Sequence, residues 1–376
     1  VGAWGDDQKG AEAGAVHLFE TDGTNWIWRA KLTASDGAAG HQFGWAVALD
    51  GDRLAVGARK APKGSATASG AVYLFEKQTE GSWTEKQKLQ PADAASYDYF
   101  GCAVALDGDE LLVGANDNDD KGSKSGSAYL FRFDRGGTQR WVQSALLLDA
   151  DGAQYDLLGS SAALRGGIAA VGAPGAFSAA GAVCLYARDE GGSNAWGRVA
   201  KVAPAELPAG IGFGASVTLT QDRLFIGAPD AALSGPLAAG AVYLYEQTGA
   251  DWKQVQLVQS ARPQESERFG ASLAVNGTWL AVGAPGCTNA GVAAGEARLY
   301  RQQAAATAFT ALVPHGGLFV LSWSGSTDRT QILQRTTSLQ PPEWIPVKTN
   351  LPPVPAMGVH TGAWTGTRAF YRIIEL

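Results

Sequence analysis

The sequence has few of the residues on which metal centres and nucleophilic catalysis depend. Its 376 residues include only three cysteines and four histidines. These lie far apart along the chain, at Cys102, Cys184, Cys287, His17, His41, His315 and His360. No CxxC pair, no metal-ligand spacing of histidines and no recognisable nucleophile motif occurs, so the sequence supports neither a zinc site nor a disulfide framework. We therefore do not expect an enzyme.

Basic charge and long hydrophobic runs are also missing. The formal net charge is −6 at pH 7, whereas nucleic-acid binding depends on an excess of basic side chains that meet phosphates. No apolar run approaches the roughly 20 residues of a membrane-spanning helix, and no polybasic segment is present to bind anionic lipid. Nucleic acid and a membrane span are therefore not expected.

Glycine, by contrast, is abundant. The chain holds 49 glycines and 12 tryptophans, and only 18% of its residues are charged. This composition favours a turn-rich β protein, because glycine is costly inside helices. Residues 43–89 show the local pattern: two short alanine-rich strands flank a tight Asp50-Gly51-Asp52 turn, and a long loop leads to a bulkier strand at Ala71. A fourth strand from Trp83 to Leu89 completes the unit.

This unit recurs with a period of 55 to 58 residues, so the repeat is the basis of the fold. A bulky residue followed by glycine marks each copy, and fourteen residues later comes Gly-Ala, followed by proline in the last three copies. The bulky residues are Phe43, Phe100, Leu158, Phe213 and Phe269. The third-strand motif, GAVYLFE in its second copy, begins at Gly14, Gly70, Gly126, Gly181, Gly240 and Gly295. The fourth strand is marked by Trp26, Trp83, Trp141, Trp196 and Trp252.

A four-stranded repeat of this length is typical of a β-propeller blade. The Phe-Gly pairs and Gly-Ala-Pro triplets resemble those of FG-GAP repeats, the blades of the integrin α-subunit propeller and of many secreted bacterial proteins. The resemblance runs from Val1 to about Gln303 and implies an all-β fold with about six or seven four-stranded blades, in a secreted or cell-surface protein. The motif is not uniform, because Leu158 replaces the Phe, and Arg59 and Asn116 replace the Pro.

The terminal blades are incomplete in the sequence. Val1-Gly2-Ala3 matches the end of a second strand, so the first blade lacks its first strand. The last copy lacks a convincing fourth strand, and the nearest candidate is the segment Phe309 to Val313. Residues upstream of Val1, the C-terminal segment, or a strand from another molecule would each complete the ring.

A second, small β domain is expected after the repeats. We place the propeller at residues 1–303, a linker at 304–308 and the second domain at 309–376, where short apolar strands alternate with Ser, Gly and Pro clusters. The LSW, QRTTSL, EW and FYRI segments resemble the fibronectin type III-like modules that end many secreted bacterial proteins. That resemblance implies a β-sandwich-like domain.

Strand order indicates where a binding site would lie. The loop that enters the first strand of a blade and the loop between its second and third strands emerge on the same side, and these loops are the long ones. Two stretches of these loops are rich in carboxylates: Asp117, Asp119 and Asp120, and then Asp149, Asp151 and Asp156. Carboxylates at these spacings either wrap Ca²⁺, the only cofactor expected, or cap N–H groups in their own turns.

Other side chains of the entering loops show a pattern as well. An acidic residue recurs seven positions before the bulky residue of four copies, at Asp36, Asp93, Asp151 and Glu206, which favours a structural role. Three tyrosines also precede these positions, Tyr97, Tyr99 and Tyr155. Their rings are suited to stack on a glycan or peptide, or to pack between neighbouring blades.

Three functions remain open at this stage. The first is a secreted or cell-surface adhesion protein that binds an extracellular protein or a glycan through the long loops. The second is a self-assembling subunit of an extracellular filament or layer, completed by strand or domain exchange. The third is a carbohydrate-active enzyme that uses a pair of carboxylates. The repeat and the missing catalytic motif favour the first.

Overall fold

The computed structural model divides the chain into two compact units, Val1–Tyr300 and Arg301–Leu376. The residues that the structure describes are 1–204, 209–232, 238–249, 251–288, 294–301, 308–315, 318–324, 331–336, 345–350, 357–363 and 370–375. Within these ranges the fold is antiparallel β-sheet with one short helix, α1 (Ala176–Ala179). No helix among these residues is long and apolar enough to cross a membrane.

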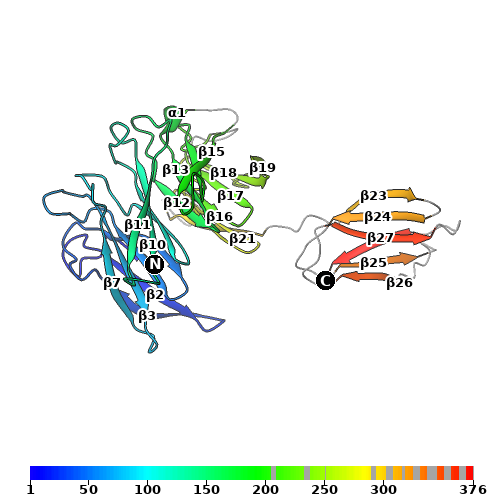
Figure 1. Ribbon diagram of the computed structural model, residues 1–376, viewed down its shortest axis with the longest axis horizontal. Coiled ribbons are helices and arrows are strands. Elements are labelled where there is room, and N and C mark those ends of the chain that lie inside the picture. The colour runs from blue at the N-terminus through cyan, green and yellow to red at the C-terminus, as the bar shows by residue number, and fades with distance from the viewer. Residues whose placement is uncertain are drawn as a thin grey trace. The chain divides into compact units, whose positions relative to one another are not determined.

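The first unit is a β-propeller of six consecutive blades, coloured from blue to yellow in Figure 1. Blade 1 consists of β1 (Gly2–Ala3), β2 (Ala15–Thr21) and β3 (Trp26–Leu32), and blade 2 of β4 (Phe43–Asp50), β5 (Arg53–Ala58), β6 (Ala71–Lys77) and β7 (Trp83–Leu89). Blade 3 consists of β8 (Ala103–Asp107), β9 (Glu110–Ala115), β10 (Ser127–Phe133) and β11 (Trp141–Leu147). Blade 4 consists of β12 (Ser161–Arg165), β13 (Ile168–Ala173), β14 (Ala182–Arg188) and β15 (Trp196–Val202). Blade 5 consists of β16 (Ser216–Leu219), β17 (Arg223–Ala228), β18 (Ala241–Thr248) and β19 (Asp251–Gln259), and blade 6 of β20 (Ser272–Asn276), β21 (Trp279–Ala284) and β22 (Glu296–Arg301).

Each blade is a meander in which strands pair in chain order. The propeller fold and the four-stranded unit predicted from the repeat are thus confirmed in blades 2 to 5. Blades 1 and 6 have three strands among the described residues. The short β1 pairs Gly2 with Val16 and Ala3 with Ala15, as the match of Val1-Gly2-Ala3 to the end of a second strand predicts.

The glycines of the repeat are required where neighbouring blades approach most closely. In blade 3 the N–H of Gly101 donates to the carbonyl of Gly114 at 2.9 Å. A Cβ atom on Gly57 of blade 2 would lie only 2.0 Å from the carbonyl oxygen of Gly101. The backbones of two blades therefore touch at this point, and no side chain fits between them.

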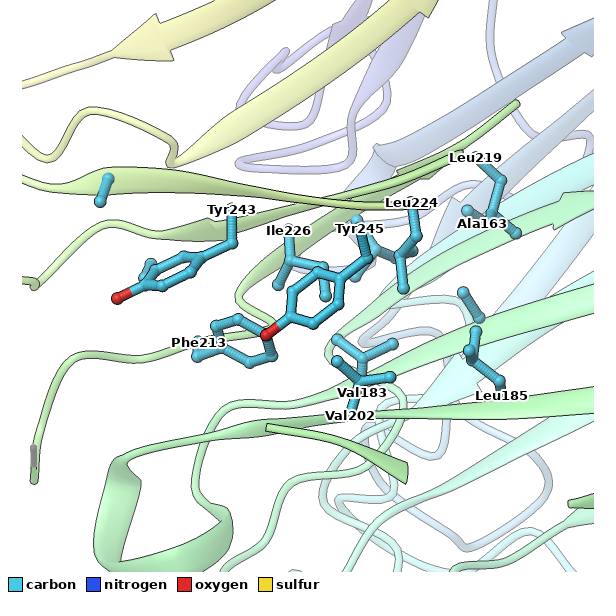
Figure 2. Packing of buried hydrophobic residues seen from close by; sticks show 14 of the residues in the cluster. Ala163, Val183, Leu185, Val202, Phe213, Leu219, Leu224, Ile226, Tyr243 and Tyr245 are labelled. Carbon is cyan, nitrogen blue, oxygen red and sulfur yellow. The ribbon is translucent and has the colours of Figure 1, made fainter. Parts of the chain in front are cut away.

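Five clusters of buried residues fill the five junctions between consecutive blades. Figure 2 shows the junction of blades 4 and 5, where Phe213 packs against Tyr243 and Tyr245 opposite Val183 and Leu185. The ring of Phe213 meets that of Tyr243 edge-on, with 5.1 Å between centroids. The bulky residue of the Phe-Gly pair is thus the centre of a junction, which explains why it recurs in every copy.

Among the described residues, no such cluster joins blade 1 to blade 6. The faces that these blades would turn toward one another carry exposed apolar side chains instead. Phe19 and Trp28 are exposed on blade 1, and Trp279 and Leu299 are exposed on blade 6. Completion of the ring by another segment or molecule therefore stays a prediction.

The second unit contains two three-stranded sheets, ordered β23-β24-β27 and β26-β25-β28. Its strands are β23 (Ala308–His315), β24 (Leu318–Ser324), β25 (Gln331–Thr336), β26 (Ile345–Asn350), β27 (Met357–Ala363) and β28 (Phe370–Glu375). The segment Phe309 to Val313 belongs to β23 and pairs with β24, so it is not the fourth strand of blade 6. Ala308, assigned to the linker from the sequence, is the first residue of β23, and residues 304–307 lie outside the described ranges. The likeness to fibronectin type III stays a prediction.

Candidate binding face

The two sides of the propeller are built differently. On the side of the tight turns, the Asp-Gly turns bind one another from blade to blade. The carboxylate of Asp50 accepts the N–H of Gly108 at 2.7 Å, and that of Asp107 accepts the N–H of Gly166 at the same distance. Asp50 and Asp107 therefore have a structural role.

On the opposite side, the long loop of one blade binds the entering loop of the next. The N–H of Tyr97 donates to the carbonyl of Thr67, and that of Tyr155 to the carbonyl of Ser123, both at 2.8 Å. We call this side the long-loop face. Its backbone is fixed by hydrogen bonds, so the side chains that it carries are held in defined positions.

Tyr97 and Tyr155 stand out on the long-loop face because of their backbone. Both have left-handed conformations, with φ of 71° and 66°. Blades 2 and 5 have Gly40 and Gly210 at the same position of the repeat, with φ of 79° and 77°. The tyrosine side chains are nevertheless 57% and 55% exposed. The loop needs a residue with left-handed backbone at this position, and glycine meets that need in blades 2 and 5. In blades 3 and 4 the residue is a tyrosine, so its exposed ring is not required by the fold.

Tyr99 has a different environment. It is half-buried, and its ring lies edge-on to that of Tyr97 with 6.4 Å between centroids. The guanidinium of Arg59 lies 3.2 Å from the centroid of Trp45 and 5.5 Å from that of Tyr99. Of the two roles considered for the tyrosines, packing between blades describes Tyr99. Tyr97 and Tyr155 are exposed, and stacking on a ligand stays a prediction for them.

The carboxylates of the loop at 149–156 already have cationic partners. Arg198 binds both Asp149 and Asp151, and Lys201 binds Asp149 at 2.6 Å. Burial would raise the pKa of Asp149, but Lys201 and Arg198 outweigh it and hold the pKa below its usual range. This loop is neutralised from within its own blade, since both cations lie on β15.

The loop at 117–120 is only partly neutralised. Lys124 forms an ion pair with Asp117 at 2.7 Å, and its backbone N–H donates to the carboxylate of Asp119. Asp120 has no ion-pair partner in the described part of the chain. Burial, and then the carboxylate of Asp93, raise the pKa of Asp120.

Neither loop shows a metal centre as it stands. Across the described ranges, no group of three or more His, Cys, Asp or Glu side chains is arranged to hold a metal ion. Calcium needs six to eight oxygen ligands at 2.3 to 2.6 Å. Calcium binding therefore stays a prediction, and in the loop at 149–156 the ion would compete with two cationic side chains.

Asp156 caps an N–H group of its own turn, the second of the two roles considered for these carboxylates, and the same cap recurs in two other blades. Its carboxylate accepts the N–H of Ala153 at 2.9 Å, that of Asp98 accepts the N–H of Ala95, and that of Glu267 accepts the N–H of Gln264. All three acids are buried. They stand two residues before the bulky residue of the repeat in three copies, and this recurrence was the available signal.

Asp98 is the acid of this group with the most unusual electrostatics. Burial raises its pKa to about 6, and the carboxylates of Asp119, Asp120 and Asp93 add to the rise. The folded protein therefore binds a proton here more tightly than the unfolded chain does, between about pH 4 and pH 6. Because stability falls with rising pH wherever the folded state holds more protons, ionised Asp98 destabilises the fold above this window.

Asp98→Asn is expected to remove this destabilisation. Its side-chain oxygen still accepts the N–H of Ala95, but the side chain never ionises. We expect the variant to gain about 3 kcal/mol over the wild type at pH 7, since each unit of pKa shift is worth about 1.4 kcal/mol, with the gain disappearing by about pH 4. Urea unfolding of both proteins from pH 4 to 7 measures this, and a constant difference across the range would contradict the raised pKa.

The acid seven residues before the bulky residue of the repeat forms hydrogen bonds in blade 2. In blade 2 the carboxylate of Asp36 accepts from the hydroxyl of Tyr73 at 2.6 Å and from Lys88 at 2.7 Å. Lys88 lies directly opposite Tyr73 in the β6–β7 pair. A structural role therefore describes Asp36 and Asp151. Asp93 forms no ion pair with a described residue, and Glu206 lies outside the described residues.

Sequence comparison agrees with this geometry. The sequence model of the FG-GAP repeat family matches residues 26–75 and 83–131. Each match begins with the fourth strand of one blade and ends in the third strand of the next. The chain contains FG-GAP repeats.

The FG-GAP propeller is also similar to a solved structure, the Pseudomonas aeruginosa periplasmic gluconolactonase PpgL. The TM-score is 0.50 at 14% sequence identity, over 96% of this chain and 98% of that one. At this identity the likeness concerns the fold alone. No curated protein is significantly similar to this chain in sequence.

Proposed function

We propose that this FG-GAP propeller is a secreted or cell-surface protein without enzymatic activity, which binds an extracellular protein or a glycan through the long-loop face of blades 3 and 4. The left-handed tyrosines carry the proposal. A bulky residue in this conformation costs roughly 1 to 3 kcal/mol, and glycine avoids that cost at the same position of blades 2 and 5. Exposed aromatic rings are effective anchors for glycans and peptides.

The test is a glycan and extracellular-protein binding array with the double variant Tyr97→Gly/Tyr155→Gly. We expect the double variant to be at least as stable as the wild type, because glycine avoids the cost of the left-handed conformation, while binding falls at least tenfold. Trp26→Ala is the matched control, since Trp26 is 73% exposed next to the tight-turn side. Equal loss of binding in the control, or full binding by the double variant, would refute the assignment of the face.

A second candidate is self-association through the open faces of blades 1 and 6. The exposed side chains of Phe19, Trp28, Trp279 and Leu299 favour it, because contiguous apolar surface on a sheet face commonly marks an interface. Light scattering across a hundredfold range of concentration decides this candidate. Self-association predicts a molar mass that rises with concentration, and a monomer throughout the range would eliminate it.

A further inference from the structure

Three blades place a lysine at one position of the fourth strand, and in each the lysine is paired with an aspartate. Lys31 of blade 1 binds Asp6, Lys88 of blade 2 binds Asp36, and Lys201 of blade 4 binds Asp149, at 2.6 to 2.7 Å. Each lysine lies opposite the fourth residue of the third-strand motif, which is His17, Tyr73 and Cys184 in turn. The ammonium group is thus a regular part of the long-loop face.

Blade 3 has the surroundings of this ammonium group but not the lysine. Tyr129 takes the place of Tyr73, and its ring meets Phe100 edge-on at 5.4 Å, much as Tyr73 meets Phe43 at 5.5 Å. The residue opposite Tyr129 in the β10–β11 pair is Leu146. The ring is therefore placed as in blade 2, while the cation that would complete the arrangement is absent.

In blade 2 the hydroxyl of Tyr73 donates to the carboxylate of Asp36, whereas two buried hydroxyl groups of blade 3 have no such partner. The hydroxyls of Tyr129 and Ser127 make no hydrogen bond, although both residues are fully buried. Ser127 stands where four other copies have alanine, so the second hydroxyl is also peculiar to blade 3. A buried hydroxyl without a partner costs roughly 1 to 3 kcal/mol, which a ligand that bonds to it would recover.

Three carboxylates act on the tyrosine hydroxyl. Burial, and then the carboxylates of Asp93, Asp120 and Asp98, raise the pKa of Tyr129, while the neighbouring hydroxyl of Ser127 opposes the rise. Neither Asp93 nor Asp120 forms an ion pair with any described residue. The nearby Lys63 is bound to the backbone carbonyls of Pro91 and Ala92.

We propose that blade 3 binds a primary ammonium group of a ligand among Asp93, Asp120 and the hydroxyls of Tyr129 and Ser127, where Lys88 supplies its own ammonium group in blade 2. The inference deepens the proposed function by naming a chemical group that its ligand would carry. It uses the same face but does not depend on the exposed tyrosines.

An ammonium group fits this site better than calcium does. It has three N–H donors, and every group around the site can accept a hydrogen bond. A carboxylate acceptor at the 2.7 Å seen for Lys88 is sufficient for it, whereas no described set of carboxylates is close enough together to ligate a metal ion. The three occupied blades show that the repeat is built to hold this cation.

The test is titration calorimetry with Nα-acetyl-lysine N-methylamide, and with butylammonium, at constant ionic strength kept with tetramethylammonium chloride. We expect saturable binding of both compounds if the ammonium group is sufficient. If the protein also contacts the neighbouring peptide groups, only the lysine derivative should bind. The norleucine analogue, which lacks the ammonium group, should not bind. Leu146→Lys should weaken binding at least tenfold, because its own side chain fills the site, and Leu146→Met should bind as the wild type does.

Thermal unfolding is used to check that the Leu146→Lys variant is folded, and we expect a raised Tm because the new ammonium group meets unpaired carboxylates. Unchanged binding by Leu146→Lys, binding of the norleucine analogue, or no binding by the wild type would overturn the proposal. So would saturable Ca²⁺ binding that the lysine derivative cannot displace. None of these outcomes affects the binding of array ligands that depends on Tyr97 and Tyr155. Failure of this proposal is therefore distinguishable from failure of the proposed function.

Discussion

Gly114→Ala is expected to destabilise the propeller by about 3 kcal/mol or more, toward the upper end of what overpacked sites cost. The added Cβ would lie 2.0 Å from the carbonyl oxygen of Gly159 in the next blade. Both groups belong to backbone that is hydrogen-bonded within its own blade, so neither can withdraw without breaking a strand pair. Chemical denaturation of the purified variant gives the value directly.

Gly136→Ala is the matched control for this prediction. Gly136 lies in an exposed turn of blade 3, and a Cβ atom there meets nothing within 4 Å. We expect its free energy of unfolding to change by no more than about 0.5 kcal/mol. A similar small change for Gly114→Ala would mean that neighbouring blades are not in the close contact described above.

Phe213→Ala is expected to cost about 3 to 5 kcal/mol, the usual range for removal of a buried phenylalanine. Its ring is fully buried between blades 4 and 5, and it contacts Tyr243 and Tyr245 edge-on. Truncation leaves a cavity that two strands from different blades cannot both close. The loss should appear as a lower denaturation midpoint with an unchanged slope.

Phe213→Leu should cost much less, about 1.5 kcal/mol or under, as for other hydrophobic exchanges of similar volume. Blade 4 already has Leu158 at this position, where it is fully buried at the junction with blade 3. If leucine were as damaging as alanine, the phenylalanine ring would have a role beyond filling the junction.

The blades could be predicted from the sequence because each copy repeats the residues that make the contacts between blades. The glycine pairs mark backbone contact between blades, and the bulky residue marks the centre of a junction, so both recur with the period of the fold. The sequence could not supply an outer strand for blade 6 for a related reason. The segment Phe309 to Val313 is as apolar as an outer strand, but composition alone does not determine which strand it pairs with. It pairs with β24.

The carboxylates of the long-loop face were harder to interpret. Asp149 and Asp151 look free in the sequence because their cations, Arg198 and Lys201, lie about 50 residues away on β15. Only the register of the blade brings them together. The left-handed backbone of Tyr97 was also hidden, although alignment of the copies on Gly40 would have shown it.

The copies therefore separate structure from function. Features that recur from blade to blade, such as the contact glycines and the bulky junction residue, hold neighbouring blades together. Features confined to one or two blades have no such explanation, and these are the exposed Tyr97 and Tyr155 and the group around Tyr129. All of them lie on loops of blades 3 and 4 or at their junctions, which is why we place binding there.

Site-specific photo-crosslinking tests this central claim most directly. A photoreactive phenylalanine derivative is placed at Tyr97, at Tyr155 or at Asp52, an exposed residue of a tight turn, and each protein is exposed to surface material of cells that produce it. The account predicts crosslinks to a partner from positions 97 and 155 and none from position 52. Crosslinks from position 52 alone, or from none of the three, would contradict it.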